Sequence, residues 1–295
     1  MFSAIPDIST SGSDITTPFW GDRTVILGPE IILRFDIAQA ALFSAFQLDA
    51  FGAIFFLLIS LVSILGAVYA IPYLASYQQT YHLRSMNALA AAFVLGMQLV
   101  ILSQSPLAFM LGWETMSITS FFLVASDRSH ASIRAALLYL VMTHLGASAL
   151  FAGFLLLSQG SLFVDFATLA SLASGAPTWM LSLYFGLFFF GFGSKAGLVP
   201  LHVWLPEAHP AAPSHISALM SGVMLKVAVY GFLRALLFIL PPIGATASLF
   251  ILGFGLLSAF YGVLYAVVER DFKRILAFSS IENIGIILLG VGSSL

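Results

Sequence analysis

The fold is decided by residues 194–215, which read SKAGLVPLHVWLPEAHPAAPSH. Four prolines lie within fourteen residues of this stretch, namely Pro200, Pro206, Pro210 and Pro213. One regular helix cannot continue through them, because each proline lacks a backbone N–H and clashes with the preceding turn. Long apolar runs flank the stretch on both sides. We therefore expect a broken helix at membrane depth, with freed carbonyls, as in the discontinuous helices of transporters.

The composition predicts an all-α, polytopic membrane protein without a sizeable soluble domain. Of 295 residues, 60% are hydrophobic and 8% are charged, and the mean hydropathy is +1.03. A soluble domain carries roughly a quarter charged residues. A transmembrane helix needs about 20 predominantly apolar residues. About eight such runs follow one another, at 50–75, 86–105, 106–126, 133–157, 180–201, 213–240, 243–268 and 273–294.

The basic residues predict an orientation, because loops rich in Lys and Arg stay cytoplasmic. One side of the spans carries Arg84, Arg128, Arg134, Arg270, Lys273 and Arg274, and the other carries Arg23, Arg34 and Arg234. We therefore expect the N-terminus outside a cell inner membrane. Residues 1–49 would form an exterior tail with a small hairpin, and 50–295 the transmembrane domain. The tail has no basic n-region, so a cleavable signal peptide is not expected.

Five ionisable residues fall inside the apolar spans: Glu114, His144, Lys195, Lys226 and Glu282. Each costs about 3 kcal/mol or more at the bilayer centre unless it faces water or a partner. The lysines carry most weight, because the chain has only three and two of them lie within spans. A buried lysine can gain and lose a proton, which a buried arginine cannot. These residues predict a proton relay.

Each of these residues also has a structural interpretation. Glu114 and Lys195 could form a static ion pair that locks two helices together. His144 could be a satisfied histidine bonded to a neighbouring helix, and Glu282 could lie near an interface. We favour the relay for Glu114 and Lys195, because a static pair needs no further titratable groups and the spans contain several.

The broken stretch adds His202, His209, His215 and Glu207. On a helix break, these residues suggest a hydrated route by which protons reach the spans. Metal binding by the three histidines is the alternative, but the prolines deny them a regular ligand spacing. The chain has no cysteine, which excludes disulfides, thiolate-held iron–sulfur clusters and cysteine-ligated zinc. We expect no cofactor, no metal and no enzyme activity on the chain itself.

Residues 194–209 resemble the seventh-helix signature of the antiporter-like subunits of respiratory complex I, Mrp-type cation/proton antiporters and membrane-bound nickel-iron hydrogenases. Gly112-Trp113-Glu114 resembles the fifth-helix glutamate of that family, residues 217–231 with Lys226 resemble its eighth helix, and residues 271–280 are similar to the polar start of its tenth. Residues 280–285 and 143–146 look more like the hydrogenase-4 and formate hydrogenlyase branch, of the component B type. The resemblance covers roughly residues 40–295.

The chain departs from the family in length. Members usually have about fourteen helices, arranged as two inverted five-helix repeats. By resemblance, this chain starts near the third helix and stops near the tenth, so one five-helix half-channel is complete and the second repeat is truncated. The sequence alone does not decide between a fragment and a short subunit.

The resemblance implies a proton-translocating membrane subunit of a redox-driven complex, of the hydrogenase or NADH/quinone-oxidoreductase type. Lys195 would be the central proton carrier, Glu114 would tune it by proximity, and Lys226 would pass the proton laterally. His202 and His209 would connect the broken helix to cytoplasmic water. Other membrane subunits and a peripheral redox arm would be the partners. The alternatives are a stand-alone sodium or potassium/proton antiporter and a structural membrane anchor.

Overall fold

The long apolar runs of the sequence form helices in the computed structural model, which describes residues 46–75, 82–242 and 244–295. The helices are α2 (Ala50–Ala75), α3 (Leu83–Leu102), α4 (Pro106–Val124), α5 (His130–Leu157), α6 (Phe166–Ser174), α7 (Thr178–Ala196), α8 (Leu205–Ala211), α9 (Ser214–Leu219), the π-helical turn η1 (Met220–Met224), α10 (Leu225–Arg234), the π-helical turn η2 (Ala235–Ile239), α11 (Ala245–Val268) and α12 (Phe272–Ser294). Among the described residues, the one β pairing outside helices is an isolated bridge between Phe46 and Ser103. The predicted all-α fold is confirmed, whereas the hairpin expected in 1–49 lies almost entirely outside the described residues.

Seven segments of the described residues are long and apolar enough to cross a membrane. Six of them are the single helices α2, α3, α4, α5, α11 and α12, and the seventh runs continuously from Ser214 to Ile239. The one predicted span not among these seven, 180–201, corresponds to α7. This helix is as long as α4, at 19 residues, but its mean hydropathy is too low for the seven. The chain is therefore a multi-pass membrane protein, and its helix ends lie within a few residues of the predicted spans.

Short polar residues set the beginnings of the helices. Ser105 accepts a hydrogen bond from the Ala108 N–H, and Pro106 follows at the first position of α4. Asp271 accepts from the Arg274 N–H at the start of α12. Such caps satisfy backbone N–H groups that have no partner inside the helix. The ends of these spans are thus encoded locally.

The predicted helix break is present. The last turn of α7 is followed by Gly197, whose φ of 77° is left-handed and favours glycine. Pro200 lies in the turns that follow, Pro206 stands in the first turn of α8, and Pro210 lies near the end of α8. Pro213 stands directly before α9 and prevents α8 from continuing into it. The four prolines therefore separate α7, the short helix α8 and the span that begins with α9.

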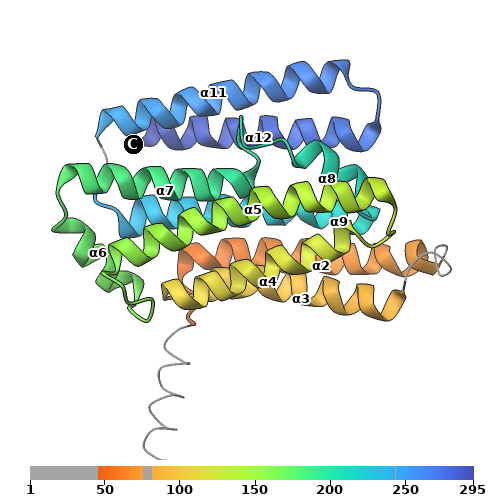
Figure 1. The fold of residues 1–295 in the computed structure, drawn as a ribbon, viewed down its shortest axis with the longest axis horizontal. Helices are drawn as coiled ribbons and strands as arrows, with labels where there is room; N and C mark the ends of the chain where they lie inside the picture. The colour runs from red at the N-terminus through yellow and green to blue at the C-terminus, as the bar shows by residue number, and fades with distance from the viewer. Residues whose placement is uncertain (1–45, 76–81, 243) are drawn as a thin grey trace, which may run out of the picture. The chain divides into compact units, whose positions relative to one another are not determined.

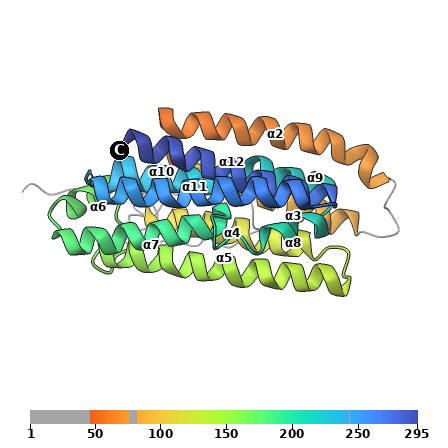
Figure 2. The ribbon, with the colours of Figure 1, turned by 90° about the horizontal axis from the view of Figure 1, so that it is seen from above.

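The long helices of the described residues lie along one common direction (Figure 1). α11 and α12 form an antiparallel pair, and α3 packs along α4. Viewed from above, α2 lies at one edge and α5 at the opposite edge, with α10, α11 and α12 between them (Figure 2). Only 11% of the apolar window of α2 is buried, against 72% for the segment from Ser214 to Ile239. That segment is therefore the centre around which the others pack.

α5 and α7 approach closely where both carry glycine. A side-chain carbon at Gly146 would lie 2.9 Å from the Gly191 carbonyl oxygen, and one at Gly191 would lie 2.9 Å from the Gly146 carbonyl oxygen. Small residues allow membrane helices to pack backbone against backbone, because lipid offers no hydrophobic driving force between them. This crossing holds the last turn of α7 against α5.

The basic residues assigned to one predicted side belong to one end of the helix arrangement. α4 and α11 end there, and α3, α5 and α12 begin there, at the right of Figure 1. Arg234, assigned to the opposite side as a loop residue, is instead a buried residue of α10 that is 5% exposed. Its charge has a partner inside the protein, which is why it does not need to lie in a loop.

Arg234 forms an ion pair with Asp49, the residue before α2, and its guanidinium also donates to the Gln104 side chain at 3.4 Å. Burial alone would raise the pKa of Asp49, but the hydrogen bonds from Arg234 and from the Gly52 N–H hold that pKa below its ordinary value. The pair ties the start of α2 to α10, which matters because α2 buries so little surface of its own.

Replacing Asp49 by Asn should lower the stability of the protein in detergent by about 1 kcal/mol, because the 38% exposure of the Asp49 side chain screens the pair. A folded-state pKa below the unfolded one means that this contribution is complete above about pH 4 and is lost as the pH falls further. Unfolding temperatures of the variant and the parent should therefore differ by a constant amount at neutral pH and converge below about pH 4. A difference that persists there contradicts the ion pair.

Candidate functional site

Lys195 lies in the last turn of α7 with 1% of its surface exposed. Its amine donates to the Ser117 hydroxyl of α4 at 2.8 Å and to the Tyr139 hydroxyl of α5 at 2.6 Å. Among the described residues, no carboxylate lies within ion-pair distance of the amine. A hydroxyl can both accept and donate a hydrogen bond. The site can therefore hold either the ammonium or the neutral amine of Lys195.

Aromatic rings enclose this amine. Its nitrogen lies 4.8 Å from the ring centroid of Tyr139 and 5.9 Å from that of Trp113. Trp204 packs on Tyr139 with ring centroids 4.8 Å apart, and its indole N–H donates to the Ser194 carbonyl at 2.9 Å. Ring faces stabilise a cation without forming a salt bridge. The rings thus contribute to holding the ammonium form and keep the amine away from lipid.

The Tyr139 hydroxyl links Lys195 to further elements. It lies 2.6 Å from the Ser120 hydroxyl of α4 and 3.6 Å from the sulfur of Met224 in η1. Lys226 comes two residues after Met224, at the start of α10. The tyrosine therefore bridges the lysine of α7 and the π-helical turn η1, which directly precedes the helix that carries Lys226.

Glu114 and Lys195 do not form the static ion pair that was the structural alternative. Glu114 lies 3.3 Å from His144, and these two side chains are 33% and 44% exposed. Both line a groove of about 380 Å³ between α4 and α5. Three residues of helix turn by about 300°, so Ser117 and Glu114 point in directions about 60° apart. Ser117 faces Lys195, and Glu114 faces the groove, from which it acts on Lys195 only through a longer-range electrostatic interaction.

Lys226 follows the π-helical turn η1 and is half-buried. Its amine donates at 2.7 Å to the Ser221 carbonyl inside that turn. The Ser221 hydroxyl lies 2.8 Å from the Ser280 hydroxyl of α12. π-Helical turns occur frequently at functional sites. Lys226 is therefore placed between the Lys195 site on one side and α12 on the other.

The histidines of the broken helix are buried. One ring nitrogen in each of His202, His209 and His215 has no hydrogen-bond partner among the described residues. The other ring nitrogen of His209 lies 3.4 Å from the Ser217 hydroxyl, and the ring lies within electrostatic range of Lys226 and Lys273. Within the described ranges, these histidines belong to no cluster that could hold a metal ion. In the described part of the chain, the three histidines thus do not form a set of metal ligands.

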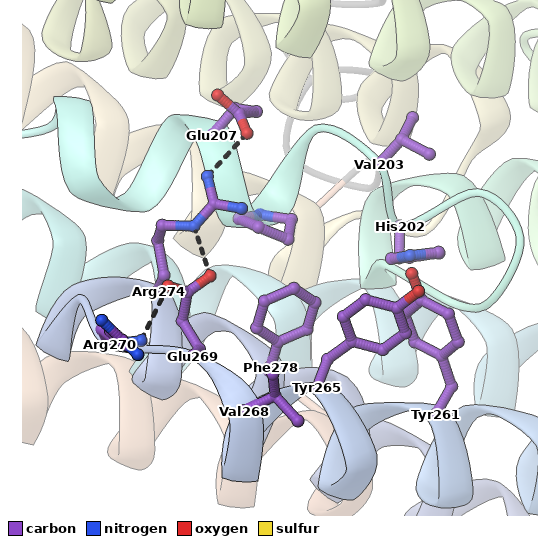
Figure 3. Close-up of a pocket in the computed structure, with 11 residues that line it drawn as sticks. His202, Val203, Glu207, Tyr261, Tyr265, Val268, Glu269, Arg270, Arg274 and Phe278 are labelled. Atoms are coloured by element: carbon purple, nitrogen blue, oxygen red, sulfur yellow. Dashed lines mark hydrogen bonds and ion pairs between the residues drawn. The ribbon is translucent and has the colours of Figure 1, made fainter.

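A cavity of about 570 Å³ opens between α8 and the α11–α12 hairpin (Figure 3). His202 lies at its wall with its ring 4.5 Å from that of Tyr261, which stacks on Tyr265 at 4.3 Å. On the opposite side of the view, Arg274 donates to Glu207 at 2.8 Å and to Glu269 at 2.7 Å. The bond from Arg274 holds the pKa of Glu269, in the loop after α11, below its ordinary value.

Residues 103–294 match the family described as NADH:quinone oxidoreductase/Mrp antiporter, transmembrane. This match covers well over half of the chain. The chain belongs to this family.

Individual relatives agree with that assignment. The chain is 39% identical over 248 residues to Hydrogenase-4 component B from Escherichia coli (strain K12), which covers 83% of this chain and 36% of that protein. A chain in the structure of the Mrp complex from Dietzia sp. DQ12-45-1b is 26% identical, with a TM-score of 0.73 over 84% of this chain and 46% of that one. The structure of an archaeal membrane-bound sulfane sulfur reductase contains a chain with the same fold, at 24% identity and a TM-score of 0.75 over 82% of this chain and 49% of that one. This chain thus spans about a third to a half of the chains it matches.

The remaining predicted residue of the antiporter family site, Glu282, lies apart from the others. It is half-buried on α12 and makes no hydrogen bond or ion pair with any described residue. Its backbone packs tightly on α11, because a side-chain carbon at Gly262 would lie 2.5 Å from the Glu282 nitrogen. The structure therefore does not join Glu282 to Lys195 or to Lys226.

Sequence reasoning missed the neutral residues of this antiporter-type site. Ser117 and Tyr139 hold the Lys195 amine, and Trp204 packs on Tyr139. Their only sequence signal is a hydroxyl or indole group inside an apolar span, and many such groups in this chain bond only to their own helix, as Ser148 does. Which hydroxyls meet a lysine depends on how α4, α5 and α7 are rotated.

Replacing Tyr139 by Phe should destabilise the protein by about 1 to 3 kcal/mol, because it removes the hydrogen bond that Lys195 donates to the Tyr139 hydroxyl and the hydrogen bond between the Tyr139 and Ser120 hydroxyls. Thermal unfolding in detergent measures this. Tyr184→Phe is the matched control: Tyr184 is 2% exposed on α7, but its hydroxyl makes no hydrogen bond with a described residue. Equal effects of the two substitutions would contradict a specific role for the Tyr139 hydroxyl.

Proposed function

We propose that this chain is a proton-translocating membrane subunit of a redox-driven complex, with Lys195 as the central proton carrier. The observation that carries the proposal is the fully buried Lys195 amine, which donates hydrogen bonds to the neutral hydroxyls of Ser117 and Tyr139 and pairs with no carboxylate among the described residues. A static structural charge at this depth would be expected to have a carboxylate partner, because an unpaired buried charge is expensive. A group that must lose and regain its proton is better served by partners that suit both forms.

The surroundings supply neighbours on both sides of the carrier. His202 at the cavity wall and His209 on α8 would receive protons from the aqueous phase, with water satisfying their unpaired nitrogens. His209 lies within electrostatic range of Lys226. Lys226 comes two residues after Met224, whose sulfur accepts from the Tyr139 hydroxyl that contacts Lys195. In the proposal, a proton arriving on one of these groups disfavours the charged form of the next.

Glu114 keeps the tuning role expected by resemblance, but it acts together with His144 and without contacting Lys195. It pairs with His144 in the groove between α4 and α5 and reaches Lys195 only through its electrostatic field. In the proposal, the charge state of this pair biases Lys195 without exchanging a proton with it directly. Both side chains are substantially exposed at membrane depth, which favours a neighbouring membrane subunit as the cover of the groove.

We further propose that the chain lies in an inner membrane. The helix ends that carry most of the basic residues gather at one end, which favours that end in the cytoplasm and the N-terminus outside an inner membrane. Residues 50–295 would act as the transmembrane proton-channel domain, beside other membrane subunits and a peripheral redox arm. The similarity to Hydrogenase-4 component B and to the NADH:quinone oxidoreductase/Mrp antiporter family supports this.

The test uses the native complex in sealed vesicles, with proton movement followed by a pH-sensitive dye during redox turnover. Lys195→Met should reduce translocation by about 100-fold or more, the usual contribution of a positioned proton-transfer group. Lys195→Arg should fail equally, because arginine keeps the charge but does not release its proton. Arg134→Gln, at an exposed position near the start of α5, is the control that should translocate normally.

The outcomes separate the proposal from its two rivals. Translocation by Lys195→Arg would overturn the role of Lys195 as a carrier and leave it as a structural charge. Proton movement that requires a sodium or potassium gradient, without redox turnover, would instead favour the cation/proton antiporter function suggested by the likeness to the Mrp complex. Normal coupling in every Lys195 variant would favour a structural membrane anchor.

A further inference from the structure

The first turn of α12 grips the short helix α8 at both of its ends. Near the C-terminal end of α8, the Lys273 amine donates to the Ala212 carbonyl at 2.8 Å and to the Pro210 carbonyl at 3.3 Å. Near the N-terminal end, Arg274 donates to the Glu207 carboxylate at 2.8 Å. Two consecutive basic residues thus hold one seven-residue helix.

α8 depends on such contacts for its position. A helix of seven residues is not stable alone, because helix nucleation is unfavourable and isolated helices shorter than about 12 residues are marginal. Turns precede α8, and Pro213 separates it from α9. The helical hydrogen bonding of α8 therefore does not continue into the segment before it or into α9. The carbonyls of Pro210 and Ala212, freed by the break, find their partner in Lys273.

Arg274 makes a second bond, and this one stays within the α11–α12 hairpin. Its Nε donates to Glu269 at 2.7 Å, while its Nη1 donates to Glu207 (Figure 3). The guanidinium is planar and can engage two carboxylates at once, so the bond to Glu207 is additional to the bond within the hairpin. Asp271 caps the same turn by accepting from the Arg274 N–H. The bond from Arg274 to Glu207 thus connects the capped start of α12 to α8.

α8 carries a group of the proposed proton path. His209 lies on it, buried, 3.4 Å from the Ser217 hydroxyl and within electrostatic range of Lys226 and Lys273. Residues of α8 and of the turn before it also form one wall of the cavity in which His202 lies. A shift of α8 of about an ångström would move His209 relative to Ser217 and would move the cavity wall beside His202. Misplacement on that scale can cost about 100-fold in rate.

We propose that Arg274 and Lys273 are positioning residues that fix α8, and with it His209 and the wall beside His202, relative to the α11–α12 hairpin. The inference rests on the proposed function, because it assigns the proton path a mechanical link. Displacement of the first turn of α12 moves α8. A movement of the α11–α12 hairpin thereby changes proton uptake at His209 and His202. Arg274 and Lys273 themselves do not transfer protons.

Two single substitutions in the native complex test the link. Glu207→Gln removes the Arg274 bond that reaches α8, and Glu269→Gln removes the Arg274 bond that stays within the hairpin. Each takes one partly exposed ion pair from the same arginine, so both should shift the unfolding temperature to a similar small extent. Glu207→Gln alone should slow redox-driven translocation, by about tenfold, and raise amide hydrogen exchange in residues 205–211.

A substitution of Lys273, which contacts the C-terminal end of α8, provides an independent test. Lys273→Met should also raise exchange in residues 205–211 and slow translocation, because it releases the Pro210 and Ala212 carbonyls. Arg274→Lys retains the charge and should recover most of the translocation lost in Arg274→Gln. Equal translocation in Glu207→Gln and Glu269→Gln, or unchanged exchange of α8 in Glu207→Gln and Lys273→Met, overturns the inference.

These outcomes are distinct from failure of the proposed function. If Lys195→Arg translocates normally, the proton path through Lys195 fails, whatever α8 does. If Lys195→Met and Lys195→Arg are inactive but Glu207→Gln behaves like Glu269→Gln, the path stands and the positioning role fails. Hydrogen exchange of α8 reports on the grip directly and needs no proton movement.

Discussion

The rest of the structure is arranged around one constraint, the burial of the Lys195 amine among hydroxyl and aromatic groups. An amine at this depth needs partners from several helices, and it finds them on α4 and α5. The close crossing of α5 and α7 at Gly146 and Gly191 brings those helices within reach. Because the partners are neutral, the site is not locked into one charge state as a salt bridge would be. This property makes the site suitable for moving a proton.

The broken helix follows directly from the same site. Lys195 stands two residues before Gly197, where α7 ends, so the amine lies where regular backbone bonding stops. The groups freed by the break are satisfied by other elements: the Ser194 carbonyl by Trp204, the Val199 N–H by the Ser258 hydroxyl, and the later carbonyls by Lys273. Irregular backbone is tolerated at membrane depth only with such partners. The break therefore depends on side chains of α11 and α12.

The acidic groups lie at the periphery of this arrangement. Glu114 faces the groove with His144, Glu207 and Glu269 meet at Arg274, and Glu282 has no partner among the described residues. Lys195 and Lys226 are left with neutral neighbours in the interior. This separation keeps the interior lysines out of fixed ion pairs and places the carboxylates where other parts of a complex, or the aqueous phase, can reach them.

The sequence by itself determined the membrane class, the spans, the helix break and the residues that stand out as ionisable. Hydrophobic runs, caps such as Ser105 and Asp271, and the prolines act locally, over a few residues, so they can be read without knowing the neighbours. Only the tertiary structure decided which side chains meet. A span places Glu114 and Ser117 in the membrane, but about 60° of helix rotation separates a groove from the centre, and that rotation is set by packing. The burial of Arg234 and the bond between Arg274 and Glu207 were decided in the same way, by residues far apart in the chain.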